Sequence, residues 1–161
     1  MLLMRMVQLN QKKISSMNSF SNRIINWYKD NGRHDLPWRK NISPYSIWIS
    51  EIMLQQTQVK TVIPYFNKFI EKYPKLEALL QASEDEILTQ WSGLGFYRRA
   101  KNIYKACRVI SEDFNNKLPI NISDLESLPG IGRSTAGAIM SIAFNEGHPI
   151  LDANVKRVLG R

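Results

Sequence analysis

The stretch Leu128-Pro-Gly-Ile-Gly-Arg-Ser-Thr-Ala-Gly-Ala-Ile139 decides the fold of this chain. Its pattern predicts the end of one helix, a tight turn at Gly130 and Gly132, and a second helix that begins after the turn. We expect both glycines to be free to take positive φ, because neither has a side chain. Backbone N–H groups and Arg133 can then face an anion such as a phosphate. An ordinary helix–helix connection with capping glycines is the alternative.

Helical periodicity continues through most of the remaining chain, with no alternating strand pattern and no internal repeat. A serine that directly precedes a proline, or that stands three residues before a glutamate, is typical of a helix N-terminus. A proline often follows the end of a helix. These signals predict helices from Ser43-Pro44 to about Gln56, from Val59 to Pro74 with Pro64 inside, from Ser83 to Trp91, and from Ser123 to the glycine turn. The predicted class is all-α.

The charge balance indicates a polyanionic partner. Among 161 residues, 22 Lys and Arg stand against 14 Asp and Glu, which gives a formal net charge of +8. An excess of this size is typical of proteins that bind nucleic acid, although a merely basic protein would have the same count. The length fits one domain or part of one.

The sequence offers no ligand set for a metal. Its one cysteine, Cys107, falls in a helical apolar pattern with Ile103 and Ile110, which predicts a buried thiol. The two histidines, His34 and His148, complete no zinc or iron–sulfur pattern. We therefore expect no metal in this chain, and a reducing compartment such as the cytoplasm.

The N-terminal segment is basic and lacks the features of an export signal. Residues 1–29 contain no Asp or Glu, and no apolar run in the chain approaches the ~18 residues that span a bilayer. We expect a disordered leader over 1–20, one domain over 21–161, and no membrane partner. An organellar transit peptide, or a start at Met17, is the alternative for the leader.

A glycine loop with two aromatic residues, Gly93-Leu-Gly-Phe-Tyr97, precedes a basic helix. Rings such as Phe96 and Tyr97 can stack between bases while Lys and Arg neutralise phosphates, so the combination suits nucleic acid. The alternative is a solvated charged face with one or both rings in the core. The basic residues of this helix are Arg98, Arg99, Lys101, Lys105 and Arg108.

Glu51 is a candidate general acid. At helical spacing its neighbours include Ile47, Trp48 and Leu54, so the carboxyl group should lose hydration and its pKa should rise. The alternative is a glutamate at the edge of the apolar stripe, paired with Lys or Arg.

Asp152 follows an extended apolar stretch and stands at the start of a helix, where it competes with Asn154 for the N-cap. If it lay near Glu51, its negative charge could stabilise the positive charge that develops as a glycosidic bond breaks. A separation of a hundred residues does not establish that proximity.

Five motifs together resemble the adenine DNA glycosylases of the MutY type, in the helix-hairpin-helix and endonuclease III superfamily. They occur in family order and spacing between Trp27 and the last residue. The motifs are Leu36-Pro-Trp-Arg39, Trp48-Ile-Ser-Glu-Ile-Met-Leu-Gln-Gln-Thr-Gln58, Gly93-Leu-Gly-Phe-Tyr97, Leu128-Pro-Gly-Ile-Gly-Arg-Ser-Thr-Ala-Gly137 and Leu151-Asp-Ala-Asn-Val-Lys-Arg157.

The resemblance implies a role for each matching position. Glu51 corresponds to the acid that protonates the departing adenine, and Asp152 to the carboxylate that stabilises the sugar cation. Phe96 stands where the family usually has a tyrosine that wedges beside the oxidised base, Gln56 where a residue inserts into the duplex, and Arg39 where a residue lines the adenine pocket. The other expected DNA contacts are Gln55, Tyr97, Gly130, Gly132, Arg133 and Ser134.

The resemblance implies a six-helix-barrel-like domain with its hairpin at about 124–143. The implied reaction is hydrolysis of the N-glycosidic bond of adenine opposite 8-oxoguanine or guanine, after base flipping, by a cytoplasmic, nucleoid-associated monomer bound to double-stranded DNA. Endonuclease III-like relatives carry a lysine where this chain has Ser134, and a serine hydroxyl forms no Schiff base. We therefore expect a monofunctional hydrolase.

The family pattern continues beyond this sequence. Intact members bind a [4Fe–4S] cluster through four cysteines and usually carry a further domain that reads 8-oxoguanine. We expect a catalytic domain that is incomplete at its C-terminus, before the iron–sulfur region. Two alternatives stay open: a DNA-binding fragment without turnover, and an endonuclease III-like glycosylase acting on pyrimidine lesions.

Overall fold

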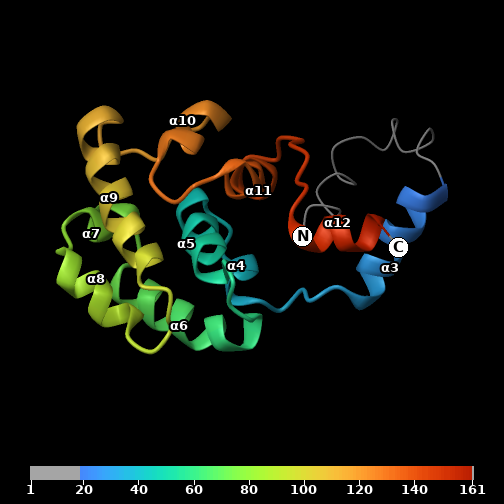
Figure 1. The fold of residues 1–161 in the computed structure, drawn as a ribbon, viewed down its shortest axis with the longest axis horizontal. Helices are drawn as coiled ribbons and strands as arrows, with labels where there is room; N and C mark the ends of the chain where they lie inside the picture. The colour runs from blue at the N-terminus through green and yellow to red at the C-terminus, as the bar shows by residue number, and fades with distance from the viewer. Residues whose placement is uncertain (1–18, 161) are drawn as a thin grey trace.

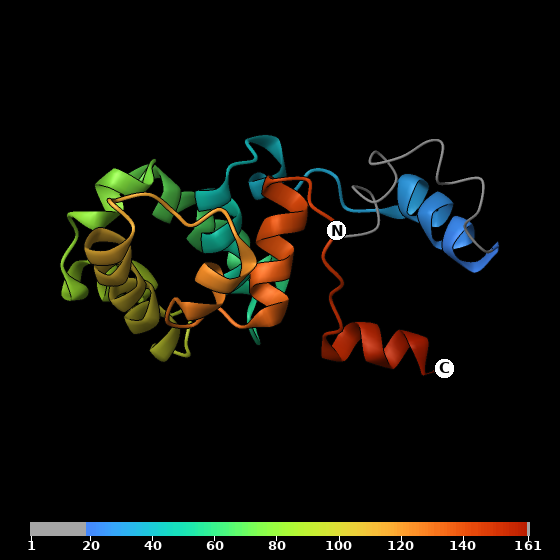
Figure 2. The same cartoon turned by 90° about the horizontal axis from the view of Figure 1, so that it is seen from above.

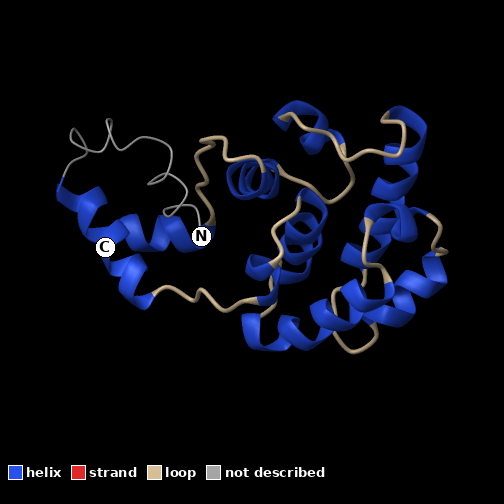
Figure 3. Cartoon of the chain, turned by 180° about the vertical axis from the view of Figure 1, so that it is seen from behind, coloured by secondary structure: helices blue, strands red, loops and turns tan. Residues whose placement is uncertain are grey.

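The computed structural model describes residues 19–160, and every regular element in that range is a helix (Figure 3). The all-α prediction is therefore confirmed. Residues 1–18 of the expected leader lie outside the described residues, and Ser19 and Phe20 already belong to the first helix. The helices are α3 (Ser19–Asn31), α4 (Pro37–Lys40), α5 (Pro44–Leu54), α6 (Val59–Lys72), α7 (Leu76–Leu80), α8 (Glu84–Trp91), α9 (Arg98–Asp113), α10 (Ile122–Ser127), α11 (Arg133–Ala143) and α12 (Ala153–Leu159).

Helix α5 forms the centre of the molecule, in contact with α4, α6 and α11 (Figure 1). It begins as predicted: Ser43 is the N-cap, its hydroxyl accepts the N–H of Ser46 at 3.0 Å, and Pro44 is the first helical residue. Eight of its 11 residues are buried, so it is apolar on nearly every side, as expected of a core helix.

A second group of helices, α6 to α9, packs against α5 through α6. Helix α6 contains Pro64 as predicted, and the capping box of Ser83 and Glu86 opens α8. Helix α9 packs against α7 and α8 and buries Ile103, Cys107 and Ile110, which confirms the buried thiol.

The hairpin of α10 and α11 differs from the prediction in two details. The N-cap of α10 is Asn121, whose side-chain oxygen accepts the N–H of Asp124 at 2.9 Å, so the expected cap at Ser123 is wrong. The earlier start includes Ile122 in the helix, where it packs against the core. Only Gly130 takes positive φ, at 84°; Gly132 has φ −91° because it serves as the extended N-cap of α11.

The segment after α11 turns back along that helix. The Ser141 hydroxyl donates to the His148 carbonyl and accepts the His148 N–H, both at 3.3 Å, and Ile150 approaches Gly137. The segment then leads to α12, which lies apart from the body of the molecule (Figure 2). None of the helices between residues 19 and 160 has the length and apolar character needed to cross a bilayer.

Candidate active site

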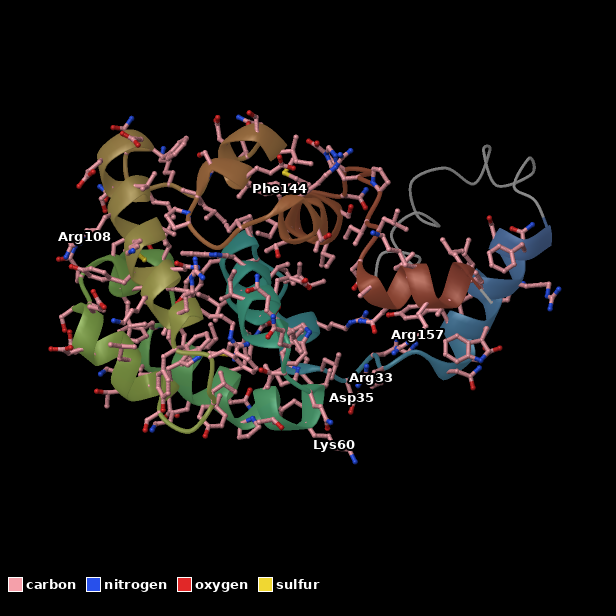
Figure 4. The ribbon with its side chains drawn as sticks, viewed as in Figure 1. Arg33, Asp35, Lys60, Arg108, Phe144 and Arg157 are labelled. Atoms are coloured by element: carbon pink, nitrogen blue, oxygen red, sulfur yellow. The ribbon has the colours of Figure 1, made fainter. Side chains whose placement is uncertain are left out.

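A cavity of about 1090 Å³ opens between the core helices α4, α5 and α11 and the start of α12. Both candidate catalytic carboxylates, Glu51 and Asp152, line it. Arg33 and Lys60 add positive charge to its wall; Arg33 lies on the segment between α3 and α4, and Lys60 lies at the start of α6 (Figure 4). The other predicted site residues that line the cavity are Arg39, Gln55, Gln56 and Ser134.

Glu51 is the one charged residue of the core helix α5. It follows Ser50 and precedes Ile52, which are both buried, and its own side chain is only partly exposed, at the cavity. Loss of hydration through burial is the main reason that the pKa of Glu51 is raised to about 7, and the negative charge of Asp152 contributes to this rise. Neither of the two ion pairs found among residues 19–160 involves Glu51, so the alternative of a surface ion pair is not met there.

Asp152 reaches the same cavity because the segment after α11 runs back toward α5. Its carboxylate is the N-cap of α12 and accepts the N–H of Val155 at 2.7 Å, so Asp152 rather than Asn154 holds that position. The two roles are therefore compatible, because the Asp152 side chain caps α12 and lines the cavity at the same time.

Arg39 is held by an aromatic residue that sequence analysis did not select. Its guanidinium lies 5.4 Å from the centre of the Tyr28 ring, and its Nη1 donates to the Tyr28 hydroxyl. Tyr28 also lines the cavity, although it belongs to α3. The available signal was its place on the apolar face of that helix, where it is 8% exposed, but this pattern is common to all packed helices.

The two neighbouring glutamines differ in what they contact. Gln55 is part-buried, and its Nε2 donates to the carbonyl of Gly130 at 3.2 Å and to the Thr135 hydroxyl at 3.4 Å, so it ties the end of α5 to the hairpin. Gln56 is exposed and takes a left-handed conformation with φ 57°. Of the two, Gln56 is the one whose side chain is directed to solvent.

The aromatic loop presents both rings to solvent. Phe96 is 56% exposed and Tyr97 47%, so the alternative that places them in the core is wrong. Phe96 also has positive φ, at 50°, next to Gly95 at 78°. Like the hairpin glycines and Arg133, these two residues lie outside the cavity lining.

Arg99 does not belong to the exposed basic face on which it was expected. It is 6% exposed, and its guanidinium donates to backbone carbonyls at the end of α5 and to that of Gly95. The physical reason is spacing, because Arg99 stands four residues before Ile103 on the same buried stripe that continues to Cys107 and Ile110. That register was readable in the sequence but was outweighed by the residue's charge.

The hairpin exposes the start of α11. The first amides of a helix have no acceptor within it, and here they follow Gly132 beside the exposed side chains of Arg133 and Ser134. An anion could be held there by backbone dipoles and a full positive charge.

The donor set does not fit the iron–sulfur cluster that the resemblance implies for intact family members. The sequence has a single cysteine, and burial raises the pKa of the Cys107 thiol to about 12, which disfavours the thiolate that a metal requires. Within residues 19–160 no group of His, Cys, Asp and Glu could hold a metal ion.

Comparison with known proteins identifies a family and several relatives of this chain. Residues 49–161 match the family model of the HhH-GPD superfamily base excision DNA repair protein. The adenine DNA glycosylase of Buchnera aphidicola subsp. Schizaphis graminum is 57% identical over 142 residues, which are 88% of this chain and 41% of that protein. The human adenine DNA glycosylase is 39% identical over 159 residues, which are 93% of this chain and 29% of that protein.

Solved structures share the fold. A thermostable thymine-DNA glycosylase superposes with a TM-score of 0.81 at 33% identity, covering 88% of this chain and 65% of its own. A trapped endonuclease III–DNA covalent intermediate gives a TM-score of 0.74 at 24% identity, which shows the fold alone. The chain spans about two fifths of the length of its bacterial relatives from Buchnera. The hairpin, the helical architecture and these matches together show that the chain belongs to the HhH-GPD superfamily of base excision DNA repair proteins.

Proposed function

We propose that this chain carries the catalytic part of a monofunctional DNA glycosylase that releases adenine mispaired with 8-oxoguanine or guanine. The observation that carries the proposal is that Glu51, with its pKa raised to about 7, and Asp152 line one cavity. The relatives named adenine DNA glycosylases support the choice of adenine over other bases.

Glu51 supplies the proton in the proposed reaction. A glycosylase rotates its target nucleotide out of the duplex into a pocket, and a cavity of about 1090 Å³ has room for a nucleoside. With a pKa near 7, about half of the Glu51 side chains carry a proton at neutral pH. Transfer of that proton to a ring nitrogen of adenine makes the base a neutral leaving group when the bond to the sugar breaks.

Asp152 stabilises what the departing base leaves behind. Cleavage of the glycosidic bond gives the bond's electron pair to adenine and leaves a positive charge on the sugar. A carboxylate in the same cavity lowers the free energy of that cation. Water then adds to the anomeric carbon and gives a proton to the solvent, which completes hydrolysis.

The remaining predicted residues hold and open the DNA. The amides that begin α11, with Arg133, hold a backbone phosphate, while Gln56 and Phe96 enter the base stack. Arg39, fixed by Tyr28, lines the pocket for the extruded base. Phosphate contacts by a chain of net charge +8 make affinity fall steeply as salt is added.

Ser134 makes the proposed enzyme monofunctional. A hydroxyl at this position cannot form an imine with the sugar, so the strand stays intact after the base leaves. Borohydride added during turnover should then trap no stable cross-link between protein and DNA. Efficient trapping would contradict the assignment.

Single-turnover base release tests the proposal. The chain is incubated with duplexes that contain adenine opposite 8-oxoguanine, adenine opposite guanine, or thymine opposite guanine. We expect adenine to be released from the first two, and Glu51→Gln to slow release by about 10²–10⁴-fold while it leaves DNA binding intact. Glu86→Gln, on an exposed capping residue far from the cavity, is the matched control.

Two other outcomes favour different functions. Binding without any release, with no preference for the mispair, identifies a DNA-binding fragment that does not turn over. Release of thymine but not adenine identifies a pyrimidine-specific enzyme, as the name of the thymine-DNA glycosylase neighbour would suggest. Either outcome contradicts the proposed function.

A further inference from the structure

Two exposed residues have a backbone conformation that their side chains disfavour. Gln56 has φ 57° and Phe96 has φ 50°. The other non-glycine residues with positive φ between residues 19 and 160 are three asparagines, which tolerate this region well. A left-handed glutamine or phenylalanine persists only where surrounding contacts hold the backbone.

One guanidinium supplies those contacts for both residues. Nη1 of Arg99 donates to the carbonyl of Gln55 at 2.7 Å, and Nη2 donates to the carbonyl of Gly95 at 3.1 Å. These carbonyls belong to the peptide groups that immediately precede Gln56 and Phe96. The φ angle of a residue is the rotation about the bond between its N and its Cα, so holding the preceding peptide group fixes one side of that rotation and restricts the φ angle.

Arg99 is itself rigidly placed. It is buried, its guanidinium lies 5.5 Å from the centre of the Trp91 ring and 5.3 Å from that of Phe96, and Nη1 also donates to the carbonyl of Ile52 at 3.1 Å. The indole N–H of Trp91 donates to the Gly95 carbonyl as well, at 3.1 Å. A planar guanidinium can serve two carbonyl groups in different directions, whereas a lysine ammonium would not keep this geometry.

We infer that Arg99 is a positioning residue that holds Gln56 and Phe96 in their left-handed conformations at a fixed separation, so that both side chains enter a DNA duplex together. The inference rests on the proposed function only in that DNA is the ligand. It joins the end of α5, which carries Glu51, to the aromatic loop that is remote from it in sequence. Arg99 needs no contact with DNA to act in this way.

The first test measures opening of the duplex without any bond cleavage. A duplex with 2-aminopurine beside 8-oxoguanine becomes more fluorescent when a side chain separates the stacked bases. We expect Arg99→Met to reduce this fluorescence rise roughly tenfold, because the two strained residues would no longer be held in their left-handed conformations. Glu112→Gln removes an exposed charge from the same helix, has no part in the proposed DNA contacts, and should leave the rise unchanged at saturating protein.

A mutant cycle separates positioning from general damage to the fold. The preference of the protein for mispaired over matched duplex is measured for the wild type, Arg99→Met, the double variant Gln56→Ala with Phe96→Ala, and the triple variant. If Arg99 acts through the two side chains, its substitution lowers the preference only when they are present. Where a melting experiment shows that Arg99→Met is unfolded, Arg99→Lys replaces it in the same cycle.

The outcomes are distinct. The inference is overturned if Arg99→Met keeps the wild-type fluorescence rise, or if it lowers the preference by the same factor in both backgrounds. Absence of adenine release by the wild-type chain would contradict the proposed function but not this inference, because neither measurement requires cleavage.

Discussion

Substitution of Glu51 by glutamine should make the protein more stable while it removes catalysis. The pKa of Glu51 rises from its ordinary value of 4.5 to about 7, chiefly because burial penalises the charged carboxylate. Between these two pH values the folded state binds more protons than the unfolded state, so stability falls as pH rises through this window and stays lower above it. At about 1.4 kcal/mol for each pKa unit, the loss is about 3 kcal/mol, an upper limit because Glu51 keeps some contact with solvent.

Glu51→Gln removes the charge and therefore the penalty. We expect its free energy of unfolding to exceed that of the wild type by up to about 3 kcal/mol at pH 8 and to match it near pH 4. Urea denaturation followed by tryptophan fluorescence at a series of pH values gives the difference. Single-turnover adenine release by the same variant should fall by about 10²–10⁴-fold, the usual contribution of a general acid.

A second glutamate provides a control with the opposite sign. The pKa of Glu86 is lowered, because its carboxylate accepts the Ser83 backbone N–H and hydroxyl, so Glu86 stabilises the fold above its unfolded pKa and loses that effect as pH falls. Glu86→Gln should therefore be less stable than the wild type at pH 8. If Glu51→Gln is no more stable than the wild type at pH 8, the explanation of its raised pKa by burial is refuted.

The remaining predictions concern pH, the hairpin and the thiol. The rate of adenine release should fall about tenfold for each pH unit well above 7, as the proton-bearing form of Glu51 is depleted, and a profile flat to pH 9 would exclude it as the acid. Gly130→Ala should lower the free energy of unfolding by roughly 1–3 kcal/mol in a denaturant titration, because Gly130 has φ 84° and a Cβ there would lie 2.9 Å from the Cβ of Asn102. Gly132→Ala should leave the free energy of unfolding unchanged, because Gly132 has φ −91° and open space around it. Cys107 should react with a thiol reagent at neutral pH only at the rate of unfolding, since the thiol is buried and its pKa is about 12.

The parts of the fold that could be predicted from the sequence are those with local causes. The start of α5 at Ser43-Pro44 and the capping box at Ser83 depend on hydrogen bonds within a few residues, so the sequence contains the whole signal. The start of α10 was misplaced although its cause is also local, because Asn121 and Ser123 are both good caps and only the packing of Ile122 distinguishes them.

The parts that could not be predicted depend on contacts between distant segments. That Glu51 would be desolvated followed from its neighbours on the helix, but that Asp152 lines the same cavity required the path of the chain after α11. The tie from Gln55 to Gly130 joins residues 75 positions apart, and no periodic pattern predicts it. Arg99 was expected on the exposed basic face of α9 because of its charge, whereas its position in the buried stripe of that helix determines its burial.

The position of Glu51 on a core helix explains how the fold tolerates it. A partly buried carboxylate that opposes folding by about 3 kcal/mol would unfold a marginal helix, but each fully buried large apolar side chain contributes about 1.5–3 kcal/mol, and Trp48, Ile49 and Met53 on the same helix are fully buried. The end of this helix is in turn fixed to the aromatic loop through Arg99 and to the hairpin through Gln55. The proposed proton donor, the residues proposed to enter the duplex and the proposed phosphate-binding turn are therefore joined to one helix, so we expect a shift of the DNA at the hairpin to change the position of the base relative to Glu51. Substitutions that loosen either tie should accordingly lower the rate of base release more than they lower the affinity for DNA.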